Sequence, residues 1–545
     1  MAIITLNKRI FEKEIGKLNE EMQEKISMFG TPVESINSEE IQIEVFPNRP
    51  DLLSYQGFKR SFLAFLGKKT GLREYKFNPP KKDYKVIVDS SVKDVRPHTA
   101  CAIIHELQFD EEKIKEIIEI QEKLHATLGR KRKKIAIGIY PLEKIKLPIT
   151  FTAREPDKIK FVPLESEKEM SGLEILQHHP TGIEYSPLLA GQRKFPIFID
   201  SDNNVLSMPP IINSQKTGKV DSSTKSVFIE CSGFDMEVLE KCINMLSTCM
   251  ADMGGKVYKM EVQYPSEKKT YPNLKPEEMR ISLEGTNKFL GLKLNEKEMK
   301  NLLERMGHKY DKGKVFVPAW RTDVLHEVDL IEDVAIAFGY ENFIPEIPEI
   351  STIGEESKKE ILKRKFSEIL SGLGLLEVSN YHLTNKNDQF KKMKSPEENF
   401  IEVEESKTEY TILRKNLSHY IMKNLSENID VEYPQKIFEI GKVFDLENGI
   451  SEKECLSIAI APGNFTEIRQ VLEYFANEVR IELKFSEPKE APENFISGRV
   501  AEITFKNKLI GFLGEVHPKI LKNWKIKMPI SLLEISLENI IDELY

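Results

Sequence analysis

Four carboxylates near residue 330 have the spacing of a metal site. Asp329, Glu332 and Asp333 would share one face of a helix, and Asp323 lies in the connection just before it. Carboxylate oxygens are the ligands that Mg²⁺ prefers in proteins. Acidic residues in the first turns of a helix also stabilise it through its dipole, with no metal. The spacing alone leaves both interpretations open.

The residues around this set predict how it is held. Apolar residues recur at helical spacing from Val328 to Phe338, and Gly339 is expected to end that helix. The apolar run at Lys314–Pro318 predicts a strand before it. An earlier helix is expected to begin at Asn295, with Glu298 completing a capping box. A strand and two helices would therefore support the four carboxylates.

The same stretch resembles a known family. The runs PAWRTD, DLIED and AFGY, between positions 318 and 340, resemble the B5 domain of the phenylalanyl-tRNA synthetase β-subunit family. The resemblance implies that Asp323, Asp329, Glu332 and Asp333 hold a magnesium ion near an α subunit. The helix–helix–strand order also resembles a winged helix. Its balanced acidic and basic residues argue against a surface that reads a nucleic-acid groove.

The first 84 residues predict a small α/β module. Ile41–Phe46 is strand-like, and Asn48 and Arg49 are typical turn residues. Asp51 is expected to cap a helix over Leu52–Leu66. The run FPNRPDLLSYQGFKRSFLAFLG resembles the B1 module of the same family.

The segment 85–263 has a mixed α/β pattern and resembles the family's B3/B4 editing module. The resemblance rests on HHPTGIEYSPLLAGQRKFPIFIDSDNNVLSMPPIIN and on TKSVFIECSGFD. It implies hydrolysis of Tyr-tRNA(Phe), because an apolar pocket for phenylalanine cannot strongly reject tyrosine. It places Phe198, Ser207, Glu230 and Ser232 in the editing pocket. The family usually has Leu, Asp and Thr where this chain has Phe198, Glu230 and Ser232.

Three other features of this segment have less specific interpretations. GRKRKK, residues 129–134, is the most basic run of the chain, and such a run is most often a solvated loop or helix end. Tyr140 and Pro141 stand where the resemblance leads us to expect a His-Asp pair. Adjacent His178 and His179 in an extended segment would point to opposite faces, which disfavours a shared metal.

The last unit, 354–545, is expected to be a scaffold. Lys358–Leu373 predicts an amphipathic helix, and 376–383 predicts a strand. TEYTILRKNLSHYIMKNLSENI, PQKIFEIGKVFD and GFLGEVHPKILKNWKI resemble the family's B6/B7 region, a degenerate class II synthetase domain. A working class II site has several arginines, whereas Arg414 and Arg499 occur singly. The resemblance therefore implies that ATP chemistry lies on a partner.

Composition sets the broad class. The 545 residues are 40% hydrophobic and 30% charged, as in soluble globular proteins. A net charge of −8 excludes a general basic sheath for nucleic acid. The five cysteines form no C-x-x-C pair, so buried free thiols are expected and zinc is not. No apolar run suits a membrane span or signal peptide, so a cytoplasmic chain with no membrane partner is expected.

Together these features predict an α+β multidomain protein. The expected parts are a B1 module (1–84), a B3/B4 editing module (85–263), a winged-helix-like B5 domain (273–347) and a degenerate class II synthetase-like antiparallel-sheet domain (354–545). The resemblance implies a phenylalanine–tRNA ligase β subunit of archaeal/eukaryotic type in an α₂β₂ heterotetramer, with Mg²⁺ and tRNA(Phe). ATP and phenylalanine would bind the α subunit. A nuclease or phosphoryl-transfer enzyme, and a scaffold without editing, remain alternatives.

Overall fold

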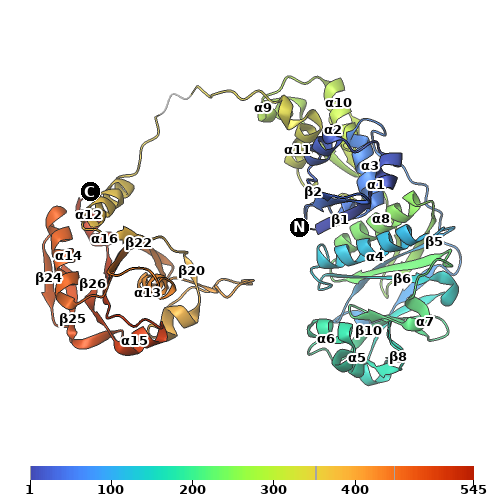
Figure 1. Ribbon diagram of the computed structural model, residues 1–545. Coiled ribbons are helices and arrows are strands. Elements are labelled where there is room, and N and C mark those ends of the chain that lie inside the picture. Colours follow the sequence, from blue (N-terminus) through green and yellow to red (C-terminus); the bar gives the residue numbers. More distant parts are fainter. Residues whose placement is uncertain (1, 350–352, 447–448, 545) are drawn as a thin grey trace. The chain divides into compact units, whose positions relative to one another are not determined.

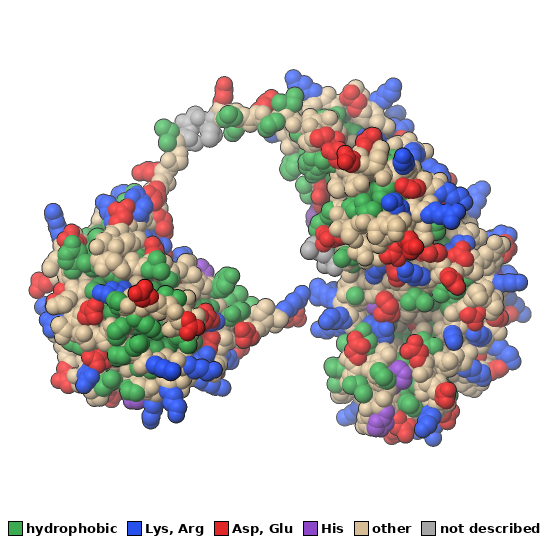
Figure 2. Space-filling view, viewed as in Figure 1, with side chains coloured by type: hydrophobic (Ala, Val, Ile, Leu, Met, Phe, Trp, Pro, Cys, Tyr) green, Lys and Arg blue, Asp and Glu red, His purple; other side chains and the backbone are tan. Residues whose placement is uncertain are grey.

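The computed structural model describes residues 2–349, 353–446 and 449–544. The chain divides into two compact units, one up to residue 346 and one from residue 347 (Figure 1). The division falls at the end of the predicted part 273–347, and positions 350–352 lie outside the described residues. Acidic and basic side chains are interspersed over the visible face of each unit (Figure 2), in keeping with the modest net charge. Among the described residues, no helix has the length and apolar character needed to cross a bilayer.

A three-stranded antiparallel sheet begins the first unit. Its strand order is β1-β3-β2, and its strands and helices are β1 (Ala2–Asn7), β2 (Val33–Ile36), β3 (Glu40–Val45), α1 (Lys8–Glu14), α2 (Glu20–Met28) and α3 (Tyr55–Phe65). β3 alternates buried and half-buried residues, the pattern of a strand with one face on the core. It confirms the strand predicted at Ile41–Phe46.

The helix predicted over Leu52–Leu66 is present as α3, but Asp51 does not cap it. Ser54 is the N-cap, and its Oγ accepts a backbone hydrogen bond at 3.0 Å. Asp51 is buried and receives two hydrogen bonds from Arg49, from Nε and Nη2, each at 2.9 Å. A guanidinium satisfies both carboxylate oxygens at once, which a backbone amide does not. The prediction of Asp51 as cap was therefore wrong.

A ten-stranded sheet forms the centre of the first unit. Nine strands follow the order β12-β11-β10-β7-β4-β14-β5-β13-β6, and β15 pairs with β14. The strands are β4 (Lys85–Val88), β5 (His98–His105), β6 (Ile135–Pro141), β7 (Ile149–Arg154), β10 (Phe195–Ile199), β11 (Val205–Met208), β12 (Ile212–Asn213), β13 (Val227–Gly233), β14 (Lys256–Gln263) and β15 (Lys268–Tyr271). Around it lie α4 (Glu111–Ala126), α5 (Gly172–His178), α6 (Pro180–Tyr185), α7 (Gln215–Gly218), α8 (Met236–Asp252) and the short pair β8 (Lys160–Phe161) and β9 (Met170–Ser171).

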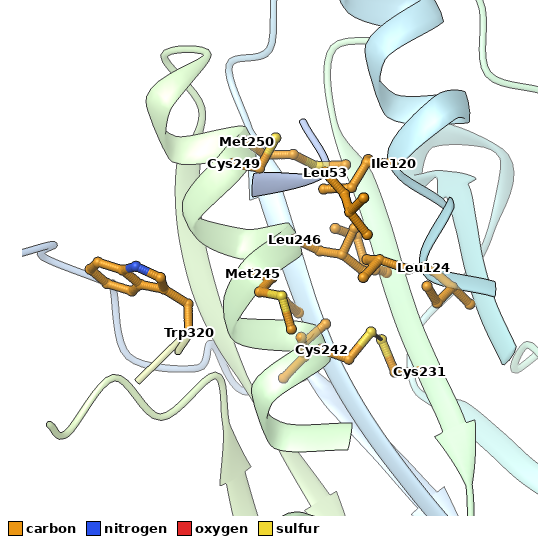
Figure 3. Close-up of a cluster of buried hydrophobic side chains, with 14 of the residues drawn as sticks. Leu53, Ile120, Leu124, Cys231, Cys242, Met245, Leu246, Cys249, Met250 and Trp320 are labelled. Atoms are coloured by element: carbon orange, nitrogen blue, oxygen red, sulfur yellow. Dashed lines mark hydrogen bonds between the residues drawn. The ribbon is translucent and has the colours of Figure 1, made fainter. Parts of the chain in front are cut away.

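Helix α8 provides much of the core of this unit. Figure 3 shows Leu246 of α8 against Ile120 and Leu124 of α4, with Leu53 of the N-terminal part beside them. Cys242 and Cys249 are free, buried thiols on α8, and the sequence predicted such thiols. The same core cluster runs from residue 4 to residue 337. The parts predicted at 1–84, 85–263 and 273–347 thus bury their apolar faces against one another.

The region of the four carboxylates contains the predicted helices and the strand predicted at 314–318, together with a strand, β17, that was not predicted. It contains β16 (Glu277–Arg280), α9 (Leu283–Leu290), α10 (Glu296–Arg305), β17 (Lys309–Asp311), β18 (Lys314–Val317) and α11 (Glu327–Phe338). The Asn295–Glu298 capping box is confirmed: Asn295 accepts from the Glu298 amide at 3.0 Å, and Glu298 accepts from the Asn295 amide at 2.8 Å. Gly339 ends α11 with φ +95°, a conformation that favours glycine.

The second unit is built on a seven-stranded sheet of order β19-β22-β23-β27-β26-β25-β24. All pairs are antiparallel except β19 with β22. The strands are β19 (Leu376–Glu377), β22 (Gln435–Asp445), β23 (Ser451–Ala461), β24 (Leu483–Ser486), β25 (Phe495–Phe505), β26 (Lys508–Val516) and β27 (Ser531–Ser536), and β20 (Leu383–Thr384) pairs separately with β21 (Ile412–Leu413). The helices are α12 (Lys358–Gly372), α13 (Ser418–Glu427), α14 (Phe465–Glu478), α15 (Pro518–Asn523) and α16 (Glu538–Leu544).

Both faces of this sheet are covered by helices. Ile458 and Ile460 of β23 face a core shared with α12 and α14, whereas Ala459 and Ala461 face one shared with α13 and α15. The helix predicted at 358–373 is confirmed, but the single strand predicted at 376–383 was wrong. Only β19 joins this sheet, whereas β20 pairs with β21; between them, Asn380 Nδ2 donates to Glu439 Oε2 at 2.7 Å.

Candidate functional site

A cavity of about 560 Å³ lies in the first unit, between α4, β6 and the turn from β11 to β12. It forms where the two ends of the ten-stranded sheet, β12 and β6, meet: Tyr140 Oη on β6 lies 3.4 Å from Asn213 Oδ1 on β12. Ser207 and Glu230, two of the four predicted pocket residues, line the cavity. Strands distant in the sheet order therefore present polar side chains to one space.

Glu230 lies at the inner wall of this cavity. It stands opposite Gly138 on β6, and its Oε1 accepts a hydrogen bond from Tyr140 Oη at 3.2 Å. Its other oxygen, Oε2, is buried and makes no hydrogen bond. Burial raises the pKa of Glu230 to about 8, although Tyr140 and the charge of Arg96 act in the opposite direction. At neutral pH the carboxyl is therefore mostly protonated, with one oxygen free to bond a ligand.

Ser207 presents a second unsatisfied group. It lies on β11 with 2% of its surface exposed, and its Oγ has no partner at full hydrogen-bond geometry, although the Tyr140 hydroxyl lies near it. Native proteins leave few buried polar atoms unpaired, because each costs about 1–3 kcal/mol. Two such atoms around one cavity are the mark of a place where a ligand supplies the missing partners.

Phe198 and Ser232 are placed behind the cavity and do not line it. Phe198 is opposite Ser207 on β10, and its ring stacks on Phe151 with centroids 4.2 Å apart. Ser232 lies two residues beyond Glu230 on β13 and accepts a hydrogen bond from Arg96 Nε at 3.1 Å. Both side chains therefore pack in the core next to the strand positions of Ser207 and Glu230.

Sequence reasoning missed three residues of the site. Asn213 and His125 line the cavity, and Tyr140 was noted only as a departure from the family pattern. The Ile137 amide donates to His125 Nε2 at 2.8 Å, and Nδ1 lies 3.3 Å from Glu122 Oε1. This leaves His125 neutral with the proton on Nδ1, and burial lowers its pKa. No local spacing in the sequence could reveal these contacts, which join separate strands and a helix.

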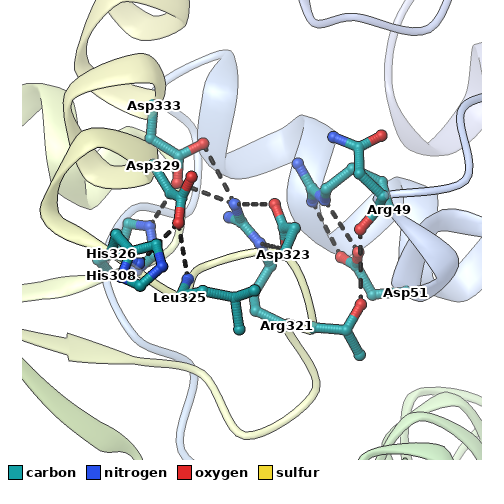
Figure 4. A network of polar contacts seen from close by, with 11 residues as sticks. Arg49, Asp51, His308, Arg321, Asp323, Leu325, His326, Asp329 and Asp333 are labelled. Carbon is teal, nitrogen blue, oxygen red and sulfur yellow. Dashed lines mark hydrogen bonds and ion pairs between the residues drawn. The ribbon is translucent and has the colours of Figure 1, made fainter. Parts of the chain in front are cut away.

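Three of the four carboxylates predicted to bind a metal, Asp323, Asp329 and Asp333, lie around the guanidinium of Arg321 (Figure 4). Arg321 donates to both oxygens of Asp323 at 2.7 Å and to Asp333 Oδ2 at 2.9 Å. His308 Nε2 is 2.7 Å from the same Asp333 oxygen. Burial would raise the pKa of Asp333, but Arg321 and His308 outweigh it and hold that pKa well below its usual range.

The other two carboxylates have fewer partners. Asp329 Oδ2 accepts from the amides of Leu325 and His326 at 2.7 Å each, so it caps the start of α11. Glu332 makes no hydrogen bond or ion pair with the described residues. Burial, and then the charges of Asp333, Asp323 and Asp329, raise its pKa. Asp329 therefore stabilises the start of the helix without a metal, as one of the two interpretations predicts. Glu332 has no cationic side chain bound to it among the described residues.

These carboxylates suit a hydrated magnesium ion bound by one or two of them better than an ion enclosed by all four. Among the described residues, no group of three or more acidic, histidine or cysteine side chains is arranged to hold a metal. Glu332 and the free Oδ1 of Asp329 fit a hydrated Mg²⁺ that takes one or two carboxylates. Asp323 and Asp333 are already neutralised by Arg321, so a cage of four carboxylates does not fit. The magnesium ion stays a prediction.

Comparison with known proteins gives the family. The chain is 39% identical over 501 residues to the phenylalanine–tRNA ligase β subunit of Thermococcus sibiricus, covering 90% of this chain and 89% of the relative. It is 36% identical over 551 residues to that of Archaeoglobus fulgidus, covering 99% of each. The chain belongs to the phenylalanine–tRNA ligase β-subunit family. The resemblance found in the sequence is therefore confirmed.

Family profiles and a solved structure divide the β subunit further. The profile for the tRNA synthetase B5 domain matches residues 279–340, which contain all four carboxylates. The profile for the phenylalanyl tRNA synthetase beta chain CLM domain matches residues 344–537, all but the first three of which belong to the second unit. A crystal structure of an N-terminal fragment of the Pyrococcus horikoshii β subunit is 37% identical, with a TM-score of 0.59, and covers 62% of this chain and 99% of the fragment. The mixed α/β multidomain fold is thus confirmed at the level of the B5 and CLM domains.

Proposed function

We propose that this chain acts as the β subunit of a phenylalanine–tRNA ligase and that its cavity hydrolyses Tyr-tRNA(Phe). With an α subunit, in an α₂β₂ heterotetramer, it would attach phenylalanine to tRNA(Phe) using ATP. The observation that carries the editing proposal is the pair of unpaired buried atoms, Ser207 Oγ and Glu230 Oε2, at one cavity.

A tyrosyl hydroxyl matches this pair chemically. A phenol has one donor and one acceptor, so it can satisfy both Ser207 and Glu230, whichever of them donates. A phenylalanyl ring would leave both atoms buried and unpaired. Sites built to bond a substrate hydroxyl reject the analogue lacking it by about 10⁴–10⁵-fold. The cavity would thus bind the mischarged amino acid and spare the correct product.

Hydrolysis itself needs a water placed against the ester. The water attacks the carbonyl carbon, the ester bond breaks, and the 3′-terminal ribose hydroxyl leaves with a proton. Holding the tyrosyl ring at Ser207 and Glu230 fixes where that carbonyl lies, and such positioning contributes much of a rate enhancement. The half-buried Asn213 and Gln215, which also line the cavity, are polar groups suited to hold the water.

The second unit supports the division of labour between subunits. Arg414 is 2% exposed and is bound to Glu439 at 2.6 Å, so its charge is used inside the protein. Arg499 is exposed and pairs with Glu515 at 2.7 Å. Both arginines are thus paired with carboxylates of the same unit. We therefore assign amino-acid activation to the α subunit and a scaffold role to residues 354–545, as a B6/B7-like, degenerate class II domain.

The face of the B5 domain around Glu332 suits a partner subunit. Phe289, Val328 and Tyr340 are 68%, 46% and 56% exposed, and all three line an apolar groove that also contains Glu332. Apolar surface of this kind at a subunit's edge marks protein contacts. We place the α subunit here, with Mg²⁺ held by Glu332 and Asp329. The ion would neutralise the acidic set at that contact.

The function is tested with this chain alone, with its α subunit, and as the double variant Ser207→Ala/Glu230→Ala. Charging of tRNA(Phe) should require both subunits, and charging by this chain alone would overturn the scaffold assignment. The double variant should charge phenylalanine normally and lose Tyr-tRNA(Phe) hydrolysis. Unchanged hydrolysis would rule out this pocket and favour the alternative, a β subunit without editing, to which the departures at Phe198, Glu230 and Ser232 also point.

A further inference from the structure

The basic run of the sequence lies at the mouth of the cavity. Residues 129–134, called here the basic loop, join α4 to β6, two elements that wall the cavity (Figure 1). Within it, Arg132 lines the cavity: its Nη1 donates to the Ile211 carbonyl at 2.8 Å, and its Nη2 to Glu122 Oε1 at 3.1 Å. Arg132 also stacks over the Tyr185 ring, 4.4 Å from its centroid. The loop is therefore fixed to the rim by one of its own arginines.

The rest of the loop carries cations without partners. Arg130, Lys131, Lys133 and Lys134 are exposed, and none makes a side-chain hydrogen bond or ion pair with the described residues. The backbone holds them in place, because Arg130, Lys131 and Arg132 all have positive φ, at 47°, 54° and 64°. Their amides bond back to the end of α4, as Arg132 N does to His125 O at 3.1 Å. Four like charges are thus crowded on a rigid turn.

The charges near the mouth favour an anion outside and a neutral group inside. Lys219 also lines the cavity and is exposed. The acidic lining residues are Glu122, which Arg132 and His125 contact, Glu165, and Glu230 at the inner wall. Buried Arg132 Nε is without a hydrogen-bond partner, like Ser207 Oγ and Glu230 Oε2. Arg132 and Lys219 thus balance Glu122 and Glu165 in the lining, and the excess positive charge comes from the four exposed cations of the basic loop beside Arg132, whereas the inner wall suits an uncharged hydroxyl.

We infer that the basic loop binds phosphates of the single-stranded 3′ end of an RNA whose terminal ester enters the cavity. This rests on the proposed function, because it supplies the part of that substrate lying outside the pocket. Single-stranded RNA has one phosphate per nucleotide, and basic grooves bind it by neutralising them. A loop fixed at the rim would hold the last phosphates while the 3′-terminal aminoacyl group reaches Ser207 and Glu230.

The test changes only the exposed charges and leaves Arg132 in place. The loop variant is Arg130→Gln/Lys131→Gln/Lys133→Gln/Lys134→Gln. The matched control, Lys484→Gln/Lys489→Gln/Lys522→Gln/Lys527→Gln, removes four charges at exposed lysines of the second unit. Each is assembled with the α subunit. Substrates are Tyr-tRNA(Phe) and 3′-O-tyrosyl-adenosine, which has the same ester but no phosphate.

The loop variant should raise KM for Tyr-tRNA(Phe) hydrolysis by about 10- to 100-fold, with kcat little changed. Its salt dependence should fall, since each single-strand phosphate contact contributes about 0.7 to the slope of log K against log salt. Hydrolysis of tyrosyl-adenosine should be unchanged in both variants. Equal KM values for Tyr-tRNA(Phe) in the loop variant and the control would overturn the inference.

A separate binding measurement distinguishes failure of the inference from failure of the proposed function. If the unmodified protein hydrolyses neither substrate, the editing function is wrong. Fluorescence anisotropy with a short RNA of the tRNA 3′-end sequence then still tests the loop. Weaker binding by the loop variant than by the control supports the phosphate site, and equal binding rejects it.

Discussion

Glu230 and Gly138 stand directly opposite each other on neighbouring strands, and a β-carbon at position 138 would lie 2.6 Å from Glu230 Oε1. It would lie 2.1 Å from Tyr140 Oη, which donates to the same oxygen. The absence of a side chain at Gly138 thus leaves the space that the hydroxyl of Tyr140 and the carboxyl of Glu230 occupy. The position of the carboxyl in the cavity depends on the residue that lacks a side chain.

Gly138→Ala should therefore displace Tyr140 and Glu230 and lower Tyr-tRNA(Phe) hydrolysis by at least about 10-fold. Overpacking of a buried site should also destabilise the protein by about 1–3 kcal/mol. Steady-state hydrolysis and thermal unfolding measure the two effects. Gly372→Ala, at a helical position with nothing within 4 Å of the new carbon, is the control and should leave both unchanged. Full hydrolysis in Gly138→Ala would contradict the assigned geometry.

Stability should depend on pH through Glu230. Its pKa is raised to about 8 in the folded protein, so the folded state holds a proton that the unfolded state releases near the ordinary carboxyl pKa. The stabilisation is complete below that ordinary value and is lost as pH rises toward about 8. The slope should approach about 1.4 kcal/mol per pH unit within this window.

Glu230→Gln removes this titration and keeps the hydrogen-bonding shape. Unfolding measured from pH 5 to pH 9 should show a fall in the stability of the unmodified protein relative to the variant. Parallel curves for the two proteins would mean that Glu230 does not titrate in this range. Glu284→Gln, at an exposed carboxyl of α9, serves as the control for the substitution itself.

Arg321 should be the most costly charge to remove from the B5 domain. It is 3% exposed and is bound to the buried Asp333 as well as to Asp323. Arg321→Met leaves two carboxylates without their cation, and breaking such buried pairs costs about 3–5 kcal/mol. Arg364→Met, at an exposed arginine that pairs with Glu356 at 3.0 Å, should change the unfolding midpoint little. Similar losses in the two variants would show that the network is not a stabilising centre.

Magnesium should stabilise the chain through Glu332. In the complex with the α subunit, added Mg²⁺ should raise the unfolding temperature, and Glu332→Gln should abolish that rise. Without magnesium this variant should be at least as stable as the unmodified protein, because the neighbouring carboxylates repel Glu332. Asp329→Ala should also lose the cap of α11, at about 1 kcal/mol. A magnesium shift that persists in Glu332→Gln would leave the acidic set with helix-end and ion-pair roles alone.

The sequence by itself determined the family and the local structure. Runs such as PAWRTD and DLIED carry the resemblance, and the Asn295–Glu298 capping box, the end of α11 at Gly339 and the core face of α8 all follow from neighbours a few residues apart. Backbone hydrogen bonding and helical periodicity act over such distances, so these features can be predicted from spacing.

Only the tertiary structure decided the sites. Ser207 and Glu230 line the same cavity because β12 and β6, the first and last strands of the sheet order, lie next to each other. The periodicity of the sequence does not predict this contact between strands. Arg321 bonds Asp323 and the buried Asp333 together, because one guanidinium can bond two acids at once. Asp51 likewise bonds to a guanidinium, that of Arg49 two residues away, in place of capping the helix. Strand pairing and buried charge pairing are decided by the whole fold, which is why spacing could not reveal them.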